Sequence, residues 1–334
     1  MKDILSRPRH QIELPHVRSR SWETNPVRGE VRWSPAKSIS FFALVLLAMI
    51  FATSVASAGA LLVCLVLTTL TLCLGHSVGL HRLLIHRSFS CPRVLERLLV
   101  YLGVLVGMGG PYGMLYLHEM RDWAQRHLDC HAFFIHRNPI WRDAWWNLHC
   151  EIELEHPPEF RPDPGVSGDR FYQFLEKTWR WQQLPLALAL YLLGGWGWVV
   201  WGICVRVPLC LSGHWLIGFL AHNRGRRGWH LHGHAVQGYN LPGLGLISMG
   251  EAWHNNHHAF PGSARHGHTA SQLDPGWWVI ACLERIGLVH DVVLPENLPL
   301  RPELELLGGG TSQTAEIDQG KSRTGAGASA PTRS

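Results

Sequence analysis

The longest uncharged stretch of the sequence constrains the fold more than any other feature. Residues 38–75 contain no Asp, Glu, Lys or Arg. A helix needs about 20 apolar residues to cross the hydrocarbon core of a bilayer, so this stretch is long enough for two. The small residues SVASAGA at 54–60 would form the turn between them. The stretch therefore predicts a helical hairpin in a membrane.

A second apolar stretch, residues 184–221, predicts a second hairpin, with GGWGW at 194–198 near its bend. Arg206 follows this bend, and we expect its long side chain to reach the membrane interface. Basic residues crowd the N-terminus and the segments after each hairpin, whereas the turns carry almost none. That asymmetry predicts four membrane helices, with both termini and the 76–183 loop in the cytoplasm.

Composition supports a membrane protein. The chain is 46% hydrophobic and 16% charged, whereas soluble domains carry about 25% charged residues. The formal charge of +5 is not clustered, so we expect no nucleic-acid partner. The eight cysteines form no CxxC pair and are interpreted as small hydrophobic residues in a reducing setting.

The fold class we expect is all-α: an integral-membrane domain with a cytosolic helical cap that holds a dimetal site. We divide the chain into a cytosolic N-terminal segment (1–37), one membrane domain (38–300) and a disordered C-terminal tail (301–334), which is rich in Gly, Ser, Thr and Ala. Residues 94–117 are apolar but interrupted by glycines. A crossing there would separate the histidine clusters, so we predict a re-entrant or interfacial segment.

The sequence contains two compact histidine clusters that are far apart along the chain. His81 and His86 are five residues apart, which on an α-helix leaves their side chains about 140° apart and better suited to a pair of metal ions than to one. His254, His257 and His258 have spacings of three and four, which place all three rings on one helix face.

A looser third region lies between them. His118 with Asp122, and His127 with His131, are i, i+4 pairs, and each pair would face one way on a helix. His222, at the end of the fourth predicted helix, lies on the same side of the membrane, because each hairpin returns the chain to the side it left. Topology therefore allows these groups to converge.

The chemical type of the candidate ligands narrows the choice of metal ion. Imidazole suits Zn, Cu, Fe or Ni, and many imidazoles converging, with or without a carboxylate, suit two redox-active irons. The metal ligands we predict are these eight: His81, His86, His118, His131, His222, His254, His257 and His258. Asp122, His127 and Glu251 are candidates either for ligation or for hydrogen bonds to the ligands. We interpret His76, His149, His156 and His290 as structural, and His230, His232 and His234 as part of an interfacial loop.

These residues resemble the histidine boxes of the membrane fatty acid desaturases of the acyl-CoA and acyl-lipid type. HRLLIHRSF at 81–89 is similar to the first box, and GEAWHNNHHAFP at 250–261 to the third. GGP at 109–111, followed by His118, has the spacing into the second box, and LAHNRG at 220–225 is similar to the segment with an extra histidine. The resemblance covers roughly residues 40–295.

The sequence departs from that family in the second box, which usually reads HxxHH. Here His118 is followed by Arg121 and Asp122 where two imidazoles would stand. Alternatively, residues 127–131 could form the box, with Cys130 replacing one histidine. Gly218 stands where family members have an asparagine one turn before the extra histidine.

The resemblance implies a chemistry and its partners. Two irons, O2 and two external electrons would insert a cis double bond into a fatty acyl chain carried on CoA, a carrier protein or a lipid. The bilayer is an implied partner as well. With no fused redox domain in the sequence, we expect a separate electron donor, of ferredoxin, rubredoxin or cytochrome type. Asp122, Asp129 and Glu251 would orient ligating imidazoles.

Two other functions fit the same residues. A di-iron membrane hydroxylase would insert oxygen into an acyl or alkyl chain instead of removing a second hydrogen. A non-catalytic metal-binding membrane protein would use the histidines only to hold or transport metal. Against the latter, transport sites usually place polar ligands inside membrane helices, whereas these clusters lie in the segments beside them.

Overall fold

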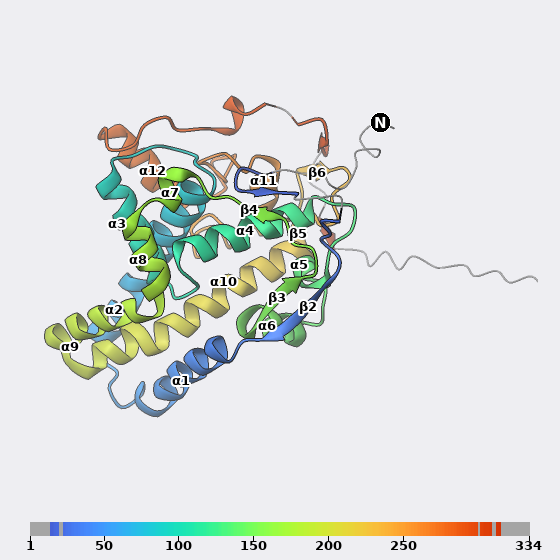
Figure 1. The fold of residues 1–334 in the computed structure, drawn as a ribbon. Coiled ribbons are helices and arrows are strands. Elements are labelled where there is room, and N and C mark those ends of the chain that lie inside the picture. Colours follow the sequence, from blue (N-terminus) through green and yellow to red (C-terminus); the bar gives the residue numbers. More distant parts are fainter. Residues whose placement is uncertain (1–13, 20–22, 300, 309–311, 315–334) are drawn as a thin grey trace, which may run out of the picture.

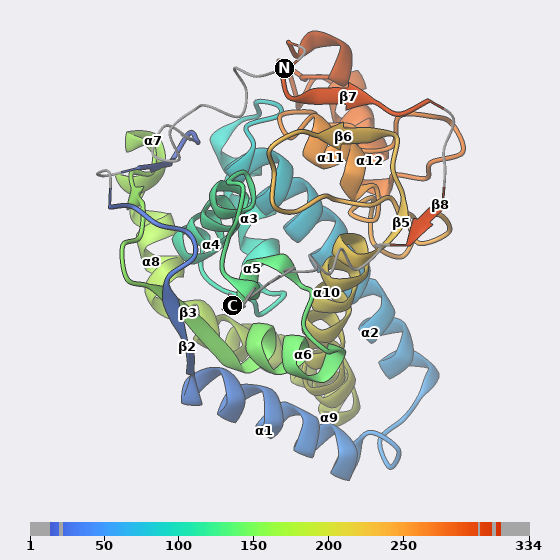
Figure 2. The ribbon, with the colours of Figure 1, turned by 90° about the vertical axis from the view of Figure 1, so that its right-hand side faces the viewer.

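The structure, a computed structural model, describes residues 14–19, 23–299, 301–308 and 312–314. Most of these residues are helical, and the strands are short and occur in pairs (Figure 1). The helices α1, α2, α9 and α10 gather at one end of the molecule, and the elements α11, α12, β6 and β7 lie at the other end (Figure 2). The prediction of a mainly helical protein is confirmed.

The first predicted hairpin is present. Helix α1 (Pro35–Phe51) is followed by a turn and by α2 (Ala58–Thr69), where Ser57 Oγ accepts a hydrogen bond from the backbone N–H of Ala60. Helix α2 continues into η2 (Leu70–Ile85), which is π-helical. The continuous run Ala58–Ile85 is long and apolar enough to cross a membrane.

The second predicted hairpin is also present. It consists of α9 (Gln183–Val199), the π-helical η4 (Val200–Val205) and α10 (Arg206–Asn223). Helix α8 (Arg170–Thr178) and η3 (Trp179–Gln182) lead into it, and the whole run Arg170–Asn223 contains a window apolar enough for a membrane. Gly195 has φ 71° and ψ −164°, which glycine adopts without a steric penalty. The chain therefore bends inside the glycine-rich segment that the sequence singled out.

Arg206 does not reach the membrane interface, contrary to our expectation. Its side chain is fully buried. It donates to the carbonyl of Leu105 at 3.0 Å, to Thr71 Oγ1 at 3.2 Å and to Gln183 Oε1 at 3.0 Å. A buried guanidinium needs such partners, and these three lie on segments that only the folded chain brings together.

The glycine-interrupted segment forms two helices joined by a sharp turn. Helix α3 (Arg93–Val104) packs along η2, and α4 (Pro111–Gln125) runs back from the turn. The chain reverses its direction at this turn, and such a reversal is what a re-entrant segment requires. Arg206 donates a hydrogen bond to the carbonyl of Leu105 at the turn, so this backbone group is satisfied within the protein.

Four two-stranded antiparallel sheets were not anticipated by the all-α prediction. They pair β1 (Val17–Arg18) with β4 (Glu159–Phe160), β2 (Gly29–Trp33) with β3 (Cys150–Leu154), β5 (Arg224–Arg226) with β8 (Ser312–Thr314), and β6 (Trp229–Leu231) with β7 (Leu304–Leu306). Each joins segments distant in sequence, so no local hairpin signal could reveal it. The remaining elements are α5 (Ala132–Ile135), α6 (Ile140–His149), α7 (Pro164–Ser167), α11 (His254–Ala259), α12 (Pro275–Arg285) and η5 (Pro295–Asn297).

Part of the predicted disordered tail is ordered by these pairings. Leu304–Leu306 pairs with Trp229–Leu231, and Arg301 donates to the carbonyl of His258 at 3.2 Å. The same pairing places His232 in an ion pair with Glu305 at 2.7 Å. Residues 315–334 of the predicted tail lie outside the described residues.

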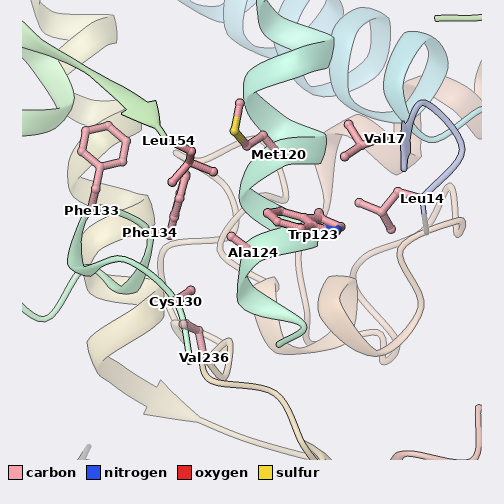
Figure 3. Packing of buried hydrophobic residues seen from close by; sticks show 10 residues of the cluster. All are labelled: Leu14, Val17, Met120, Trp123, Ala124, Cys130, Phe133, Phe134, Leu154 and Val236. Atoms are coloured by element: carbon pink, nitrogen blue, oxygen red, sulfur yellow. The ribbon is translucent and has the colours of Figure 1, made fainter. Parts of the chain in front are cut away.

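One buried apolar cluster fixes α4. Trp123 is fully buried, and Met120 and Ala124 lie beside it on the same helix (Figure 3). They pack between Leu14 and Val17 of the N-terminal segment on one side and Phe133, Phe134 and Leu154 on the other. Burying large apolar side chains on this face sets the rotation of α4 about its axis, and with it the direction of His118.

Candidate metal centre

The first imidazole cluster, group one, contains His81, His86, His118 and His257. One ring nitrogen of each lies within 4.8 Å of the others. His81 and His86 lie at the end of η2, His118 on α4 and His257 on α11. His118 Nε2 is 3.1 Å from His81 Nε2, and the ring centroids of His86 and His257 are 4.8 Å apart. The predicted convergence of three distant segments therefore occurs here.

The five-residue spacing of the first cluster works because the helix is not α-helical. The backbone N–H of His86 donates to the carbonyl of His81 at 3.1 Å, the i to i+5 pattern of a π-helix. In that geometry residues five apart lie on the same face about one turn apart. The two ring centroids are 4.9 Å apart, so the angle of about 140° expected for an α-helix does not apply. Both imidazoles can face one metal ion.

The second cluster, group two, contains His222, His254 and His258, whose ring nitrogens again lie within 4.8 Å of one another. His254 Nε2 is 3.1 Å from His222 Nε2 and 3.0 Å from His258 Nε2. His222 lies near the end of α10 and the other two lie on α11. Helix α11 thus supplies imidazoles to both clusters.

The spacing of the nitrogens fits bound metal ions better than hydrogen bonds. An imidazole–metal bond is about 2.0–2.1 Å long, so two nitrogens bound at a right angle to one ion lie about 3 Å apart. A neutral ring nitrogen is either a donor or an acceptor, so His254 Nε2 cannot satisfy both of its imidazole neighbours by hydrogen bonding. His86 Nε2 is buried, with no hydrogen-bond partner in the described part of the chain.

Burial favours the neutral state of the rings of His118, His254 and His257. Burial lowers the pKa of His118 to about 4 and that of His254 to about 3. Burial, and then the neighbouring imidazoles of His81 and His86, hold the pKa of His257 well below its usual range. Neutral imidazoles keep the lone pair that a metal ion requires.

Glu251 supports group one. Its Oε2 lies 2.7 Å from His81 Nδ1, and Ser77 Oγ donates to its Oε1 at 2.6 Å. Burial alone would favour the neutral acid, but contact with His81 holds the pKa of Glu251 well below its usual range. An ionised carboxylate at this distance favours the tautomer of His81 with the proton on Nδ1, in which Nε2 keeps the lone pair that a metal ion requires.

A buried arginine, Arg82, lies close to Glu251. Arg82 is fully buried and donates to Asp274 Oδ1 at 2.7 Å and to the carbonyl of Ala264 at 2.9 Å. Gly250 has φ +97°, and a Cβ at this position would collide with both Arg82 and Asp274. The glycine at the start of the third box is thus required by backbone conformation and by space.

The unusual second box contributes one imidazole, that of His118, to group one and a network of hydrogen bonds beside it. Asp122 Oδ2 lies 4.0 Å from His118 Nδ1, beside group one. Arg121 contacts His136 Nε2 and donates to Asn147 Oδ1. A guanidinium only donates, so His136 Nε2 must accept, and His136 is thereby withdrawn from metal ligation. Its ring stacks on His222 with centroids 5.3 Å apart.

His127 and His131 do not join either group. Helix α4 ends at Gln125, so the continuous helix that an i, i+4 pairing assumes is not present. His127 Nδ1 lies 2.8 Å from the carbonyl of Trp123. His131 Nδ1 accepts from the backbone N–H of Phe133 and caps α5.

Sequence reasoning missed His266. It forms a third set with His81 and Glu251, and its Nδ1 lies 3.2 Å from Arg82 Nη2. We interpret it as part of the support for Glu251, because Arg82 donates toward that nitrogen. It lies in a loop without periodicity, so no spacing signal could have identified it. His149, predicted to be structural, stacks on Phe42 with centroids 4.8 Å apart.

Comparison with known proteins of similar sequence identifies the family of this chain. No protein-family model matches the chain. The acyl-CoA C20 Delta5-desaturase of Anemone leveillei is 31% identical over 258 residues, which are 75% of this chain and 80% of the relative. The sn-1 stearoyl-lipid 9-desaturase of Anabaena variabilis is 33% identical over 235 residues, which are 70% of this chain and 84% of the relative.

The chain belongs to the fatty acid desaturase family. Delta-9 acyl-lipid desaturase 2 of Arabidopsis thaliana, 34% identical over 234 residues, covers 68% of this chain and 73% of the relative. The resemblance recognised in the histidine boxes is therefore confirmed. The desaturase is an oxidoreductase that acts on fatty acyl chains, and its two imidazole groups are suited to binding metal.

Proposed function

We propose that this desaturase is an integral-membrane enzyme that uses two iron ions, O2 and two external electrons to insert a cis double bond into a fatty acyl chain. The observation that carries the proposal is the pair of adjacent imidazole groups in a member of this family. His257 of group one and His258 of group two are consecutive residues. One short helix would therefore contribute an imidazole to each of the two ions.

In this proposal His81, His86, His118 and His257 bind one ion, and His222, His254 and His258 bind the other. Imidazole sets without thiolates suit iron. Asp122, at the edge of group one, is a further candidate ligand or hydrogen-bond partner. His127 and His131 are left out, because neither belongs to the two groups of converging ring nitrogens.

Bound irons would supply the oxidising power to remove two hydrogens from neighbouring methylenes. The chain's own residues have three tasks. Glu251 keeps the proton on Nδ1 of His81, so that Nε2 points into group one. Arg82 and Asp274 fix the loop that carries Glu251. The buried imidazoles keep water from the reacting carbons, which protects a strong oxidant from side reactions.

We also propose that the two hairpins cross the bilayer four times, with both termini and the imidazole groups on the cytoplasmic side. Large apolar side chains on the outer faces of these helices are exposed, among them Leu47, Leu62, Leu65, Leu188 and Leu193. Lipid is the solvent in which such surfaces are stable. His81 lies near the C-terminal end of the run Ala58–Ile85, and His222 lies near the C-terminal end of the run Arg170–Asn223.

The substrate and partners follow from the same comparison. Similar proteins are named for acyl-CoA and for acyl-lipid substrates; what they share is a fatty acyl chain, and we extend that shared part to this desaturase. Its carrier is CoA, a carrier protein or a lipid. The two electrons would come from a separate protein of ferredoxin, rubredoxin or cytochrome type.

Fatty-acid profiling of a host with and without the chain tests the proposal. We expect a new monounsaturated acid, located by mass spectrometry, that requires O2 and disappears in His257→Ala while the protein still inserts. A hydroxylated acid would instead establish a hydroxylase. Tight iron binding with no oxidised lipid would establish a metal-binding protein and overturn the proposal.

A further inference from the structure

Helix η2 carries a row of three histidines rather than two. His76, His81 and His86 are each five residues apart, and on this π-helical segment they lie on one face. The rings of His76 and His81 are nearly parallel, with centroids 6.1 Å apart. His76 is 6% exposed, and its Nδ1 has no hydrogen-bond partner among the described residues. The row therefore extends one turn away from group one.

Helix α10 carries a matching row in which one side chain is missing. His214, Gly218 and His222 are each four residues apart, and on an α-helix such residues share a face. His222 belongs to group two. Gly218 thus lies directly between a group-two histidine and His214, one turn from each.

The two rows meet at their far ends. The rings of His76 and His214 are in edge-to-face contact, with centroids 4.5 Å apart. At the other end, His81 and His222 belong to the two imidazole groups. A space between these two helix faces would therefore be bounded by the imidazole groups on one side and by the His76–His214 pair on the other.

Gly218 opens this space. A Cβ at position 218 would meet no atom within 4 Å. Its neighbours on the same face, His214 and His222, contact η2 and α11, respectively, so the face points into the protein and not toward lipid. His214 is itself exposed although it touches the buried His76, as expected for a residue in the wall of an open internal space.

We propose that the space beside Gly218, closed by the His76–His214 pair, holds the part of the acyl chain next to the metal centre and selects which chains fit. This inference rests on the proposed function. A polymethylene chain needs a gap free of side chains, which Gly218 provides, and it gains little from polar rings, so it turns or ends at the imidazole pair. Gly218 and His214 are thus specificity-determining residues.

The test is a competition between saturated acyl substrates that differ by two methylenes, offered in equal amounts. Gly218→Leu should shift the product ratio at least tenfold toward the shorter chain by raising KM for the longer one, and Gly218→Ala should shift it less. His214→Phe should act in the same direction as Gly218→Leu. Mass spectrometry reports the chain length and the double-bond position of each product.

Gly213→Leu is the matched control. A Cβ at Gly213 also meets no atom within 4 Å, but five residues along an α-helix place it about 140° from Gly218. It should leave the ratio unchanged. An unchanged ratio in both Gly218 variants, or the same shift in Gly213→Leu, overturns the inference. Absence of any unsaturated product from the unmodified enzyme would contradict the proposed function instead.

Discussion

Nδ1 of His81 lies 2.7 Å from Oε2 of Glu251, while Nε2 of the same ring lies 3.1 Å from Nε2 of His118. One imidazole thus connects the metal centre to the network behind it. The carboxylate decides which nitrogen carries the proton, and therefore which nitrogen is free to ligate.

Removing that carboxylate should weaken metal binding. We expect Glu251→Ala to lower iron affinity by about 10- to 100-fold, the usual effect of deleting a hydrogen-bond partner of a ligating histidine. Glu251→Gln should lose less, because it keeps an acceptor oxygen. Iron content after dialysis against a graded chelator measures this. Glu296→Gln, which alters an exposed ion pair with Arg265, is the control; equal iron retention in all variants would refute the role of Glu251.

The ligand set can be separated residue by residue. His257→Ala should remove one iron per chain and His258→Ala the other, each with loss of product, because these neighbours face different groups. His131→Ala should keep both irons, since its Nδ1 caps α5. Metal analysis of the purified variants decides this, and iron loss in His131→Ala would restore that residue to the centre.

Arg206 should matter for stability rather than for chemistry. Arg206→Leu leaves Gln183 Oε1 without the donor that Arg206 supplies and removes one of the two donors to the Leu105 carbonyl, at a cost of about 2–4 kcal/mol. We expect a lower Tm in detergent, and Arg206→Lys should recover only part of it because one ammonium cannot reach all the acceptors. An unchanged Tm would mean that Arg206 reaches water after all.

The contacts that hold the N-terminal segment against the rest of the protein should depend on pH. His16 Nδ1 lies 2.6 Å from Glu119 Oε1, and its Nε2 lies 3.1 Å from Asp163 Oδ2. Burial lowers the pKa of His16, but the two carboxylates outweigh it and raise the value above 6.5. Stabilisation is therefore complete below pH ~6.5 and declines as pH rises through the folded pKa.

His16→Gln should accordingly cost about 2 kcal/mol at mildly acidic pH and less at alkaline pH. Thermal unfolding of both proteins across that range measures the difference. A gap in Tm that stays constant or widens as pH rises would contradict this account. Arg161→Gln, which alters a surface ion pair with Glu159, should show no such trend.

Much of the helical layout was predictable because it is local. Residues 38–75 without a charge, and the bend near Gly195, follow from hydropathy and glycine conformation. The buried position of Arg206 was not predictable, because its acceptors lie on three other segments. The small sheets were missed for the same reason: Gly29–Trp33 and Cys150–Leu154 pair across more than a hundred residues of sequence.

For the candidate metal centre, too, the local features were predictable from the sequence and the features set by tertiary contacts were not. Residue type and spacing sufficed for His254, His257 and His258, since their helix is local. They failed for the middle region, where α4 ends before His127. His81 and His86 do meet in group one, but the angle between them expected for an α-helix was wrong, because a π-helix takes its place. Gly75 and Gly79 on η2 lie so close to the backbone of α3 that a Cβ would collide with it, a contact between two segments that no spacing rule includes.

The sequence by itself determined the chemistry, because imidazoles at these spacings and apolar runs of this length leave few other uses for the residues. The tertiary structure decided which imidazoles meet. The backbone geometry that brings them together is set by packing between distant segments. Two examples are the π-turn that aligns His81 with His86 and the end of α4 that turns His131 away. Ligation requires nitrogens about 3 Å apart, a precision that only the folded chain provides.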